Sequence, residues 1–292
     1  MTIPWKSGHE VGGMAGARQL RLSQILRELR IKAGFDQQDA ARRVGRNRSS
    51  IGHWESARSR PGRNDLDVLL TFYGVDDETR ERIQELRADS RKGGWWTLYQ
   101  LPTWFTPYVG FEADAIEGFN FETNVIPGLL QTRDYARAIH ESGRMSLDAD
   151  SVEEWVEARA QRQHRLAEDQ PLLLNVVIAE EAFHRVIGGP GVMAGQITAL
   201  IGASDRPNVK LQVIPLDAGG HPALQGGFML LRFEKHADVV FVDTTLSGHI
   251  VDNPAETAEF GRVFSVLQNL ALSVDDTRAR LATLASIYSN GQ

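Results

Sequence analysis

Three side chains able to read a base edge or a phosphate fall within one short run, as Arg48, Ser49 and His53. A guanidinium can hold O6 and N7 of guanine through two hydrogen bonds, worth about 1–3 kcal/mol of discrimination. Ser49 can donate or accept at a base or a phosphate, and His53 can reach guanine N7, or a phosphate when protonated. Gly52, without a side chain, can only permit close approach.

The charge of the chain is divided by region. The whole sequence carries −6, but residues 18–63 hold 12 Lys and Arg against 4 acidic residues, a net +8. Residues 93–292 hold 14 basic and 25 acidic residues, a net −11. A basic segment joined to an acidic body indicates a polyanionic partner for the basic part. Charge alone does not distinguish DNA from RNA or from an acidic protein.

Apolar spacing and capping residues predict five helices that would position these side chains. Leu22, Leu26 and Leu29 share one face of the first helix, which Gly34 ends. The other four are expected at Gln37–Val44 behind an Asp36–Asp39 capping box, at Arg48–Glu55 behind Asn47, after a cap at Asn64, and from Asp77. Two short helices joined by a tight turn at Gly45 fit a helix-turn-helix, in which small residues at 40 and 41 let the helices cross closely.

The run from residue 35 to residue 55 resembles the phage-repressor-like (XRE) helix-turn-helix family. The resemblance rests on Gln37, the Ala-x-x-x-Gly turn, the Ser-x-Ile core and the terminal Glu55. It implies that the second motif helix enters the major groove of DNA, with Arg48, Ser49, Gly52 and His53 at the base edges. It also implies that Gln37 holds a phosphate. Backbone contacts are expected from Arg42, Arg43, Arg46, Arg58 and Arg60. The alternative is that these arginines only form a solvated face; Trp54 and Glu55 are expected to be structural.

A Gly93-Gly94 hinge precedes an aromatic-rich stretch that begins with Trp95 and Trp96. Aromatic side chains bury large areas, so the simpler interpretation is the entry to a domain core. The other interpretation is a ligand pocket or a partner groove that includes both tryptophans.

The remaining sequence predicts an α+β domain, because strand-like and helix-like segments interleave irregularly. Strands are expected at 118–123, 172–179, 209–214, 228–233 and 239–244, and helices at 132–141, 150–168, 193–203, 254–272 and 275–288. This region also resembles the uncharacterised domain that follows this helix-turn-helix in many actinobacterial regulators, described as antitoxin-like or as partners of a small acidic protein. The matching stretches are at 108–112, 125–132, 135–136, 158–159, 162–163, 188–190, 213–215, 220–221 and 227–228.

No sequence pattern indicates catalysis or a metal site. The chain has no cysteine, no P-loop, no nucleophile elbow and no dinucleotide-binding glycine pattern, and its histidines are scattered singly. Glu180 and Glu181 are expected to begin a helix rather than act as acid and base, and Arg159, Arg162 and Arg165 to form a charged helix face. The glycine-rich loop 217–227 admits two interpretations, a flexible loop with a surface His221 or a ligand-facing loop.

The domain organisation expected is a disordered tail at 1–17, an all-α helix-turn-helix domain at 18–92 and a ligand- or partner-binding domain at 93–292. The expected function is sequence-specific transcriptional regulation by a cytoplasmic, nucleoid-associated homodimer on a double-stranded operator. A small protein partner or a small-molecule effector is expected for the second domain, without a cofactor, a membrane span or enzymatic activity. The alternative is an antitoxin-like interaction module that regulates its own operon.

Overall fold

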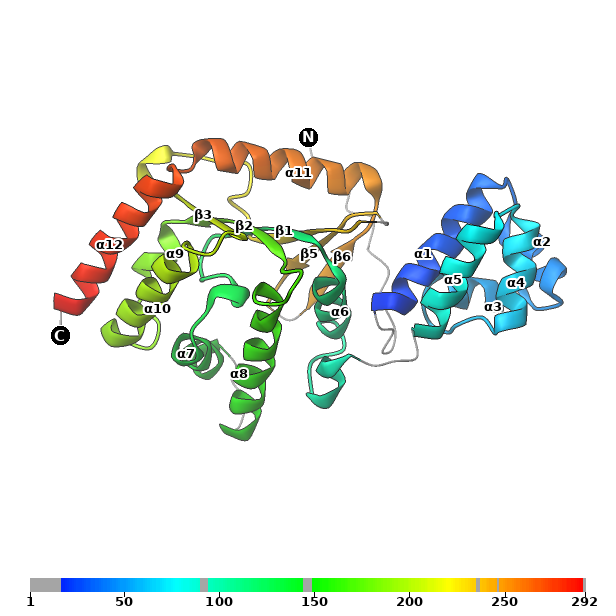
Figure 1. Cartoon of the computed structure of the whole chain (residues 1–292), viewed down its shortest axis with the longest axis horizontal. Helices are drawn as coiled ribbons and strands as arrows, with labels where there is room; N and C mark the ends of the chain where they lie inside the picture. The colour runs from blue at the N-terminus through cyan, green and yellow to red at the C-terminus, as the bar shows by residue number, and fades with distance from the viewer. Residues whose placement is uncertain (1–16, 90–93, 144–148, 235–236, 246, 291–292) are drawn as a thin grey trace. The chain divides into compact units, whose positions relative to one another are not determined.

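The computed structural model describes residues 17–89, 94–143, 149–234, 237–245 and 247–290 (Figure 1). The chain divides into two compact units, the first ending at Phe111 and the second beginning at Glu112. The tail expected at 1–17 falls almost wholly outside the described residues, as does the hinge at residue 93, so both stay predictions. None of the helices in the described part of the chain is long and apolar enough to cross a membrane.

The first unit holds the five predicted helices around one apolar core. Leu22, Ile51, Leu66 and Leu70 are each at most 1% exposed in that core. The helices are α1 Ala17–Lys32, α2 Gln37–Val44, α3 Arg48–Glu55, α4 Arg63–Phe72 and α5 Asp77–Asp89. The first unit is therefore all-α, as the apolar spacing predicted.

The turn between α2 and α3 forms as its capping residues require. The carboxylate of Asp36 accepts the backbone N–H of Asp39 at 2.7 Å, and the Asp39 side chain accepts that of Asp36 at 3.1 Å. Gly45 ends α2 with φ +66°, and Asn47 opens α3 by accepting the N–H of Ser50 at 2.9 Å. Both helix ends are thus fixed by local hydrogen bonds, which sets the angle at which α3 leaves α2.

The predicted cap of α4 is wrong. The helix begins at Arg63, one residue before Asn64, and Gly62 takes the cap position without a side-chain hydrogen bond. The chain already has the direction of α4 at Gly62, because the preceding Pro61 is buried. The backbone direction, rather than a capping side chain, therefore starts this helix.

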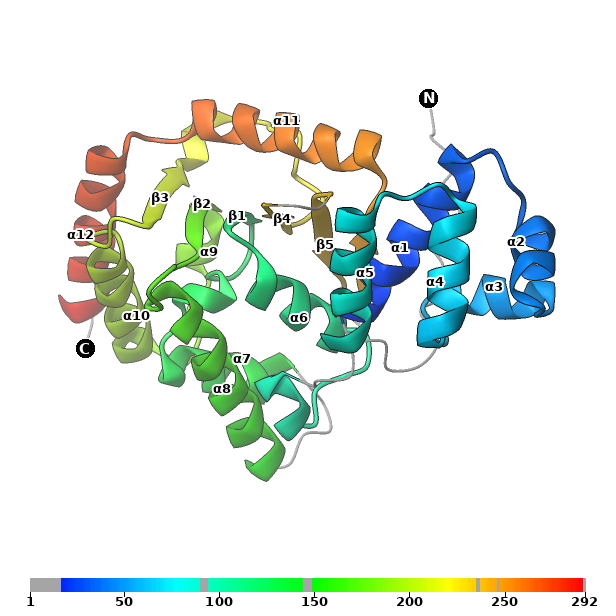
Figure 2. The ribbon, with the colours of Figure 1, turned by 45° about the vertical axis from the view of Figure 1, so that its right-hand side comes forward.

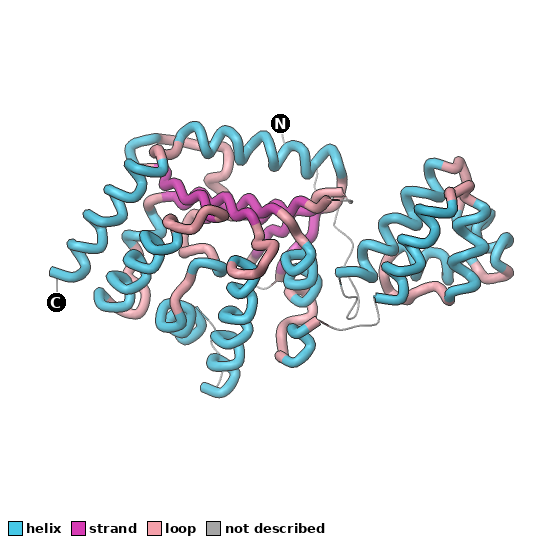
Figure 3. The backbone as a smooth tube through the Cα atoms, viewed as in Figure 1, coloured by secondary structure: helices cyan, strands magenta, loops and turns pink. Residues whose placement is uncertain are grey.

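A six-stranded mixed sheet in the order β3-β2-β1-β4-β5-β6 forms the centre of the second unit, which confirms the α+β class (Figure 3). β1 pairs parallel with β2 and antiparallel with β4, so it is the strand at which the sheet changes direction. The strands are β1 Glu117–Glu122, β2 Leu173–Ala179, β3 Val209–Ile214, β4 Phe228–Arg232, β5 Val239–Asp243 and β6 Gly248–Val251. Five of the six were predicted; the short, half-buried β6 was missed.

Helices cover both faces of this sheet (Figures 1 and 2). One face carries α11, whose Phe264 and Leu267 pack on Phe121 and Phe228. The other face carries α7, α8 and α10, with α12 packed beside α10. The bounds are α6 Thr106–Asp114, α7 Arg133–Gly143, α8 Ala149–Gln163, α9 Glu181–His184, α10 Pro190–Ala203, α11 Pro254–Leu270 and α12 Val274–Asn290.

The three arginines of α8 and the turn after it do not form the predicted charged face. Arg162 is 7% exposed and makes two hydrogen bonds of 2.7 Å to the buried carboxylate of Glu112. Arg165 donates to the backbone oxygen of Ala113 at 3.2 Å, and Arg159 donates to the side chain of Gln131. Helical spacing shows which residues share an edge, but not that this edge faces protein.

Glu180 also has a different role from the predicted one. α9 begins one residue later and has only four residues. The Glu180 carboxylate is fully buried, accepts the backbone N–H of Leu216 at 3.2 Å and pairs with Arg280 of α12. It therefore ties α12 to the ends of β2 and β3 rather than complementing a helix dipole.

Replacing Gly45 tests the left-handed turn between α2 and α3. A methyl group at this position would meet nothing within 4 Å, so the cost of Gly45→Ala is conformational alone. We expect a loss of about 1 kcal/mol in the free energy of unfolding, and a smaller loss for Gly45→Asn. Urea denaturation followed by circular dichroism measures both. Gly52→Ala, inside α3, is the control and should gain up to about 1 kcal/mol. Equal stability of Gly45→Ala and wild type would contradict the turn.

Candidate nucleic-acid interface

The first turns of α3 present a polar edge to solvent while the opposite edge packs into the core. Arg48, Ser49 and His53 are exposed, whereas Ile51 is 1% and Trp54 7% exposed. Ser49 Oγ donates to the Asn47 side chain at 2.8 Å, which leaves the hydroxyl oxygen as an acceptor. This is the arrangement in which the N-terminal side chains of a helix can reach base edges in a major groove.

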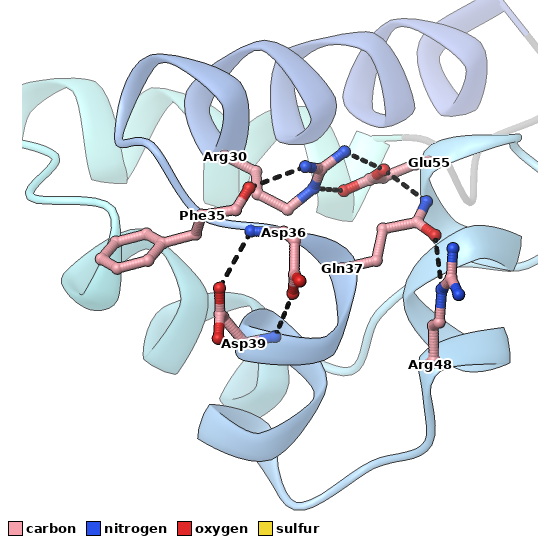
Figure 4. Close-up of polar contacts among 7 residues, drawn as sticks. All are labelled: Arg30, Phe35, Asp36, Gln37, Asp39, Arg48 and Glu55. Carbon is pink, nitrogen blue, oxygen red and sulfur yellow. Dashed lines mark hydrogen bonds and ion pairs between the residues drawn. The ribbon is translucent and has the colours of Figure 1, made fainter.

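Gln37, the first residue of α2, lies directly against this edge (Figure 4). Its Nε2 donates to Glu55 Oε2 at 3.0 Å, and its Oε1 accepts from Arg48 Nε at 3.5 Å. A Cβ on Gly52 would lie 4.0 Å from both amide atoms of Gln37. The structure therefore brings together Gln37, Arg48 and Gly52 from the predicted set.

The carboxylate of Glu55 holds the Gln37 side chain in this position (Figure 4). Arg30 of α1 donates to its two oxygens at 2.6 and 2.9 Å and also to the backbone oxygen of Phe35 at 2.8 Å. The side chains of Arg30 and Glu55 are only 11% and 5% exposed. The hydrogen bond to Glu55 raises the pKa of Arg30. Glu55 is thus held by three donors and is structural, as predicted.

The other predicted arginines lie around this centre with different partners. Arg42 pairs with Asp39 at 2.5 Å, and Arg46 pairs with Asp65 at 3.1 Å, each with more than half of the arginine side chain exposed. Exposed ion pairs contribute little to the free energy of unfolding. Both arginines can therefore exchange their carboxylate partner for a DNA phosphate at small cost. Arg58 is exposed, and Arg60 donates to the backbone oxygen of Arg87 at 3.4 Å.

Arg43 does not lie at the exposed edge of α3. Its guanidinium lies 5.7 Å from the ring centre of Phe72 on α4, and Phe72 stacks on Phe35 at 4.0 Å. These three residues line an open hollow of about 430 Å³ together with Asp39 and Arg42. No sequence pattern predicts this hollow, because it depends on how α4 packs against α2.

The three residues considered as ligand contacts belong to different units, Trp95 and Trp96 to the first and His221 to the second. Trp95 and Trp96 are half-buried in a single 3-10 turn, Trp95–Leu98, with ring centres 5.9 Å apart. His221, in the loop between β3 and β4, lies edge-on to Phe121 at 5.3 Å, and its Nδ1 is a buried atom with no hydrogen-bond partner among the described residues. His221 is therefore half-buried against β1 and is not a freely exposed surface side chain.

A polar cluster at the end of β1 was missed by the sequence analysis. Glu122, the last residue of that strand, is half-buried and accepts a hydrogen bond from Asn120 at 3.3 Å. Burial, the largest cause, acts with the charge of Asp243 to raise the pKa of Glu122 to about 7, against the opposing effects of the Asn120 hydrogen bond and the charge of Arg159. The only sequence signal was its place in an apolar strand, which does not show which way a terminal residue faces.

Buried amides hold the segment that follows β1. Gln131 Nε2 donates to the backbone oxygen of Ile126 at 2.6 Å, and Gln163 donates to that of Gln131 at 2.6 Å. Gln196 of α10, fully buried, accepts the N–H of Thr132 at 2.7 Å and donates to the oxygen of Leu130 at 2.8 Å. These contacts satisfy the backbone of residues 126–132 and fix its course beside Glu122.

Glu55→Ala tests whether the Arg30–Glu55 ion pair, which also holds Gln37, stabilises the first unit. The change leaves the Arg30 guanidinium nearly buried without its bidentate partner, so we expect a loss of about 3 kcal/mol in the free energy of unfolding. Arg42→Ala, which breaks an exposed pair, should cost less than about 1 kcal/mol. Urea denaturation of the full chain measures both. Comparable, small losses for the two variants would show that the Arg30–Glu55 pair does not organise the unit.

The pKa of Glu122 predicts a pH dependence of stability. Its ordinary value is 4.5 and its folded value about 7, so the folded state retains a proton that the unfolded chain has released between these pH values. The stability that this proton confers is complete below about pH 4.5 and is lost as the pH rises through 7. Glu122→Gln should therefore gain stability relative to wild type between pH 5 and pH 8. Thermal melting measures this, with Glu117→Gln at the other end of β1 as control. A constant difference between the Glu122→Gln variant and wild type would refute the assignment.

Comparison with known families assigns the N-terminal helices and the rest of the chain to two different family models. Residues 21–83 match a family model described as a helix-turn-helix domain, which makes the chain a DNA-binding regulator. No curated protein and no solved structure matches the chain. Residues 105–283, more than half of the chain, match the model described as domain of unknown function (DUF5753). The chain therefore belongs to the DUF5753 family and carries an N-terminal helix-turn-helix domain of the XRE type.

Proposed function

We propose that the protein is a sequence-specific transcriptional regulator that inserts α3 into the major groove of an operator. The observation that carries this proposal is the exposed edge of α3 with Gln37 held against it by Glu55. Arg48 is the base reader, with its guanidinium on guanine O6 and N7. Ser49 and His53 contact neighbouring bases or phosphates, and Gly52 allows α3 to approach closely.

Phosphate contacts on either side of α3 supply most of the affinity. Gln37 offers its amide at the start of α2, where the first N–H groups have no partner inside the helix. Arg42, Arg46 and Arg58 lie on the surface of the same unit, with exposed side chains that can meet the DNA backbone. Such contacts make binding strongly dependent on salt but carry no sequence information. In this proposal Arg43 contributes less, because it already packs on Phe72.

The second unit completes the proposed regulator. We assign to it the sensing of a small ligand or a protein partner, without catalytic activity of its own. Two copies of the chain bind a pseudo-palindromic operator in the cytoplasm, at the nucleoid, with half-sites about 34 Å apart. The net charge of −11 over residues 93–292 supports this division of labour, because an acidic body is repelled by DNA and leaves the basic unit to bind it.

Selection of genomic fragments tests the proposal. Wild-type protein bound to sheared genomic DNA at about physiological salt should enrich a short, two-fold symmetric motif. Arg48→Ala should lose or relax one position of that motif, since a bidentate guanine contact is worth about 1–3 kcal/mol. Arg82→Ala, on α5 and paired with Glu78, is the matched control and should select the wild-type motif.

Three results would each count against a part of the proposal. If wild type enriches nothing above background, the proposed operator binding is wrong. If Arg48→Ala selects the same motif as wild type, α3 does not read the operator through this residue. An asymmetric motif with one protomer per site would overturn the homodimer while leaving DNA reading intact.

A further inference from the structure

Asn47, the residue that opens α3, holds three hydrogen-bond donors on one oxygen. Its Oδ1 accepts the backbone N–H of Ser50 at 2.9 Å, the hydroxyl of Ser50 at 2.7 Å and the hydroxyl of Ser49 at 2.8 Å. A backbone N–H can only donate, so this contact fixes which atom of the Asn47 amide is the oxygen. An amide oxygen can only accept, and both serine hydroxyls therefore donate to it.

This contact decides what the Ser49 hydroxyl can offer to DNA. A serine hydroxyl has one hydrogen and two lone pairs. The hydrogen of Ser49 is committed to Asn47, and its oxygen has no donor among the described residues. Because Ser49 is exposed, this oxygen is an acceptor that remains available to a bound molecule.

Hydrogen-bond donors on DNA suit this hydroxyl better than acceptors do. A donor on DNA adds one hydrogen bond to those that Ser49 and Asn47 already make. An acceptor on DNA must take the Ser49 hydrogen away from Asn47, so that one hydrogen bond only replaces another. Donation to Asn47 also polarises the hydroxyl and strengthens its oxygen as an acceptor. Ser49 therefore favours groups on DNA that donate.

The donors in the major groove are all of one kind. They are the exocyclic amino groups, N6 of adenine and N4 of cytosine, whereas the polar atoms of guanine and thymine there are acceptors. Phosphate oxygens are acceptors as well. Arg48, the residue before Ser49, has the opposite polarity, because a guanidinium carries only donors and its Nε already donates to Gln37 at 3.5 Å (Figure 4). Two adjacent residues of α3 thus ask for opposite groups on the bases.

We propose that Ser49 reads the exocyclic amino group of an adenine or a cytosine, and that Asn47 is the positioning residue that makes Ser49 an acceptor. Arg48 takes the acceptor atoms of a guanine, and Ser49 takes an amino hydrogen of another base. The inference rests on the insertion of α3 into the major groove proposed above. It narrows the role of Ser49 to one class of base and excludes a phosphate contact for this residue.

Base analogues that lack one amino group test this inference, on the motif that the full chain selects from a random-sequence duplex library. Purine replaces each adenine and 2-pyrimidinone replaces each cytosine, one base at a time, and dissociation constants are measured. One replacement in a half-site should weaken wild type by about fivefold, the value of one hydrogen bond. The same replacement should leave the affinity of Ser49→Ala unchanged, because this variant has no acceptor to lose. The analogue that gives the effect shows whether the base is adenine or cytosine.

Two further variants separate reading of the amino group from support of the helix. Ser50→Ala is the matched control, because Ser50 donates to the same oxygen but is half-buried, and it should respond to the analogue as wild type does. Asn47→Gly keeps a residue that is tolerated at a helix cap but frees the Ser49 hydroxyl to donate or accept. The penalty for the missing amino group should then fall below about twofold. Loss of the cap alone would weaken binding to every duplex alike and leave that penalty unchanged.

Each outcome decides the inference. A penalty that disappears in Ser49→Ala, shrinks in Asn47→Gly and persists in Ser50→Ala supports it. Equal penalties in wild type and Ser49→Ala for every analogue overturn the reading of an amino group, and a full penalty in Asn47→Gly overturns the positioning role. A motif that shows no penalty dependent on Ser49 leaves the proposed operator binding standing. A library from which wild type selects no motif overturns both proposals together.

Discussion

Glu55 ends the recognition helix, yet its carboxylate lies almost out of contact with water between α1 and α2. Arg30 grips both oxygens at 2.6 and 2.9 Å, and Gln37 donates to one of them. A buried carboxylate needs such partners, and once paired it resists any movement that would separate them. Three helices are thereby joined at one anion, so the edge of α3 is held in place before DNA arrives. Preorganisation of this kind reduces the ordering cost of binding.

The second unit uses buried polar side chains in a similar way. Gln131, Gln163 and Gln196 together satisfy the backbone after β1, and Arg162 and Glu112 pair completely in the interior. At the end of the same strand, Glu122 has one shared amide donor.

The elements of the first unit could be predicted because local signals specify them. The leucine spacing, the Asp36–Asp39 box, Gly45 and Asn47 each act within a few residues, and the helices begin and end accordingly. Strand bounds in the second unit were also close, since apolar runs and turn residues are local. The predicted Asn64 cap of α4 was wrong, because Gly62 takes the cap position without a side-chain hydrogen bond.

Features that depend on distant contacts were not predictable in the same way. Arg162 was expected in solvent, but its partner Glu112 lies 50 residues away. Glu122 and Asp243 lie at the same end of the sheet only because of the order of the strands, and no spacing in the sequence encodes that order. Arg43 was expected to contact the DNA backbone, but its guanidinium lies over the ring of Phe72, which belongs to the later helix α4. In each case the sequence shows the type of the residue but not which distant residues surround it in the fold.

The central claim is that Glu55 serves DNA recognition through Gln37, and a double-mutant cycle on the selected operator tests it most directly. Dissociation constants are measured for wild type, Gln37→Ala, Glu55→Gln and the double variant. Each single change should weaken operator binding, and the double variant should bind about as weakly as Gln37→Ala alone, because Glu55 has no Gln37 left to position. Additive losses, or operator binding that Gln37→Ala does not weaken, would contradict the account.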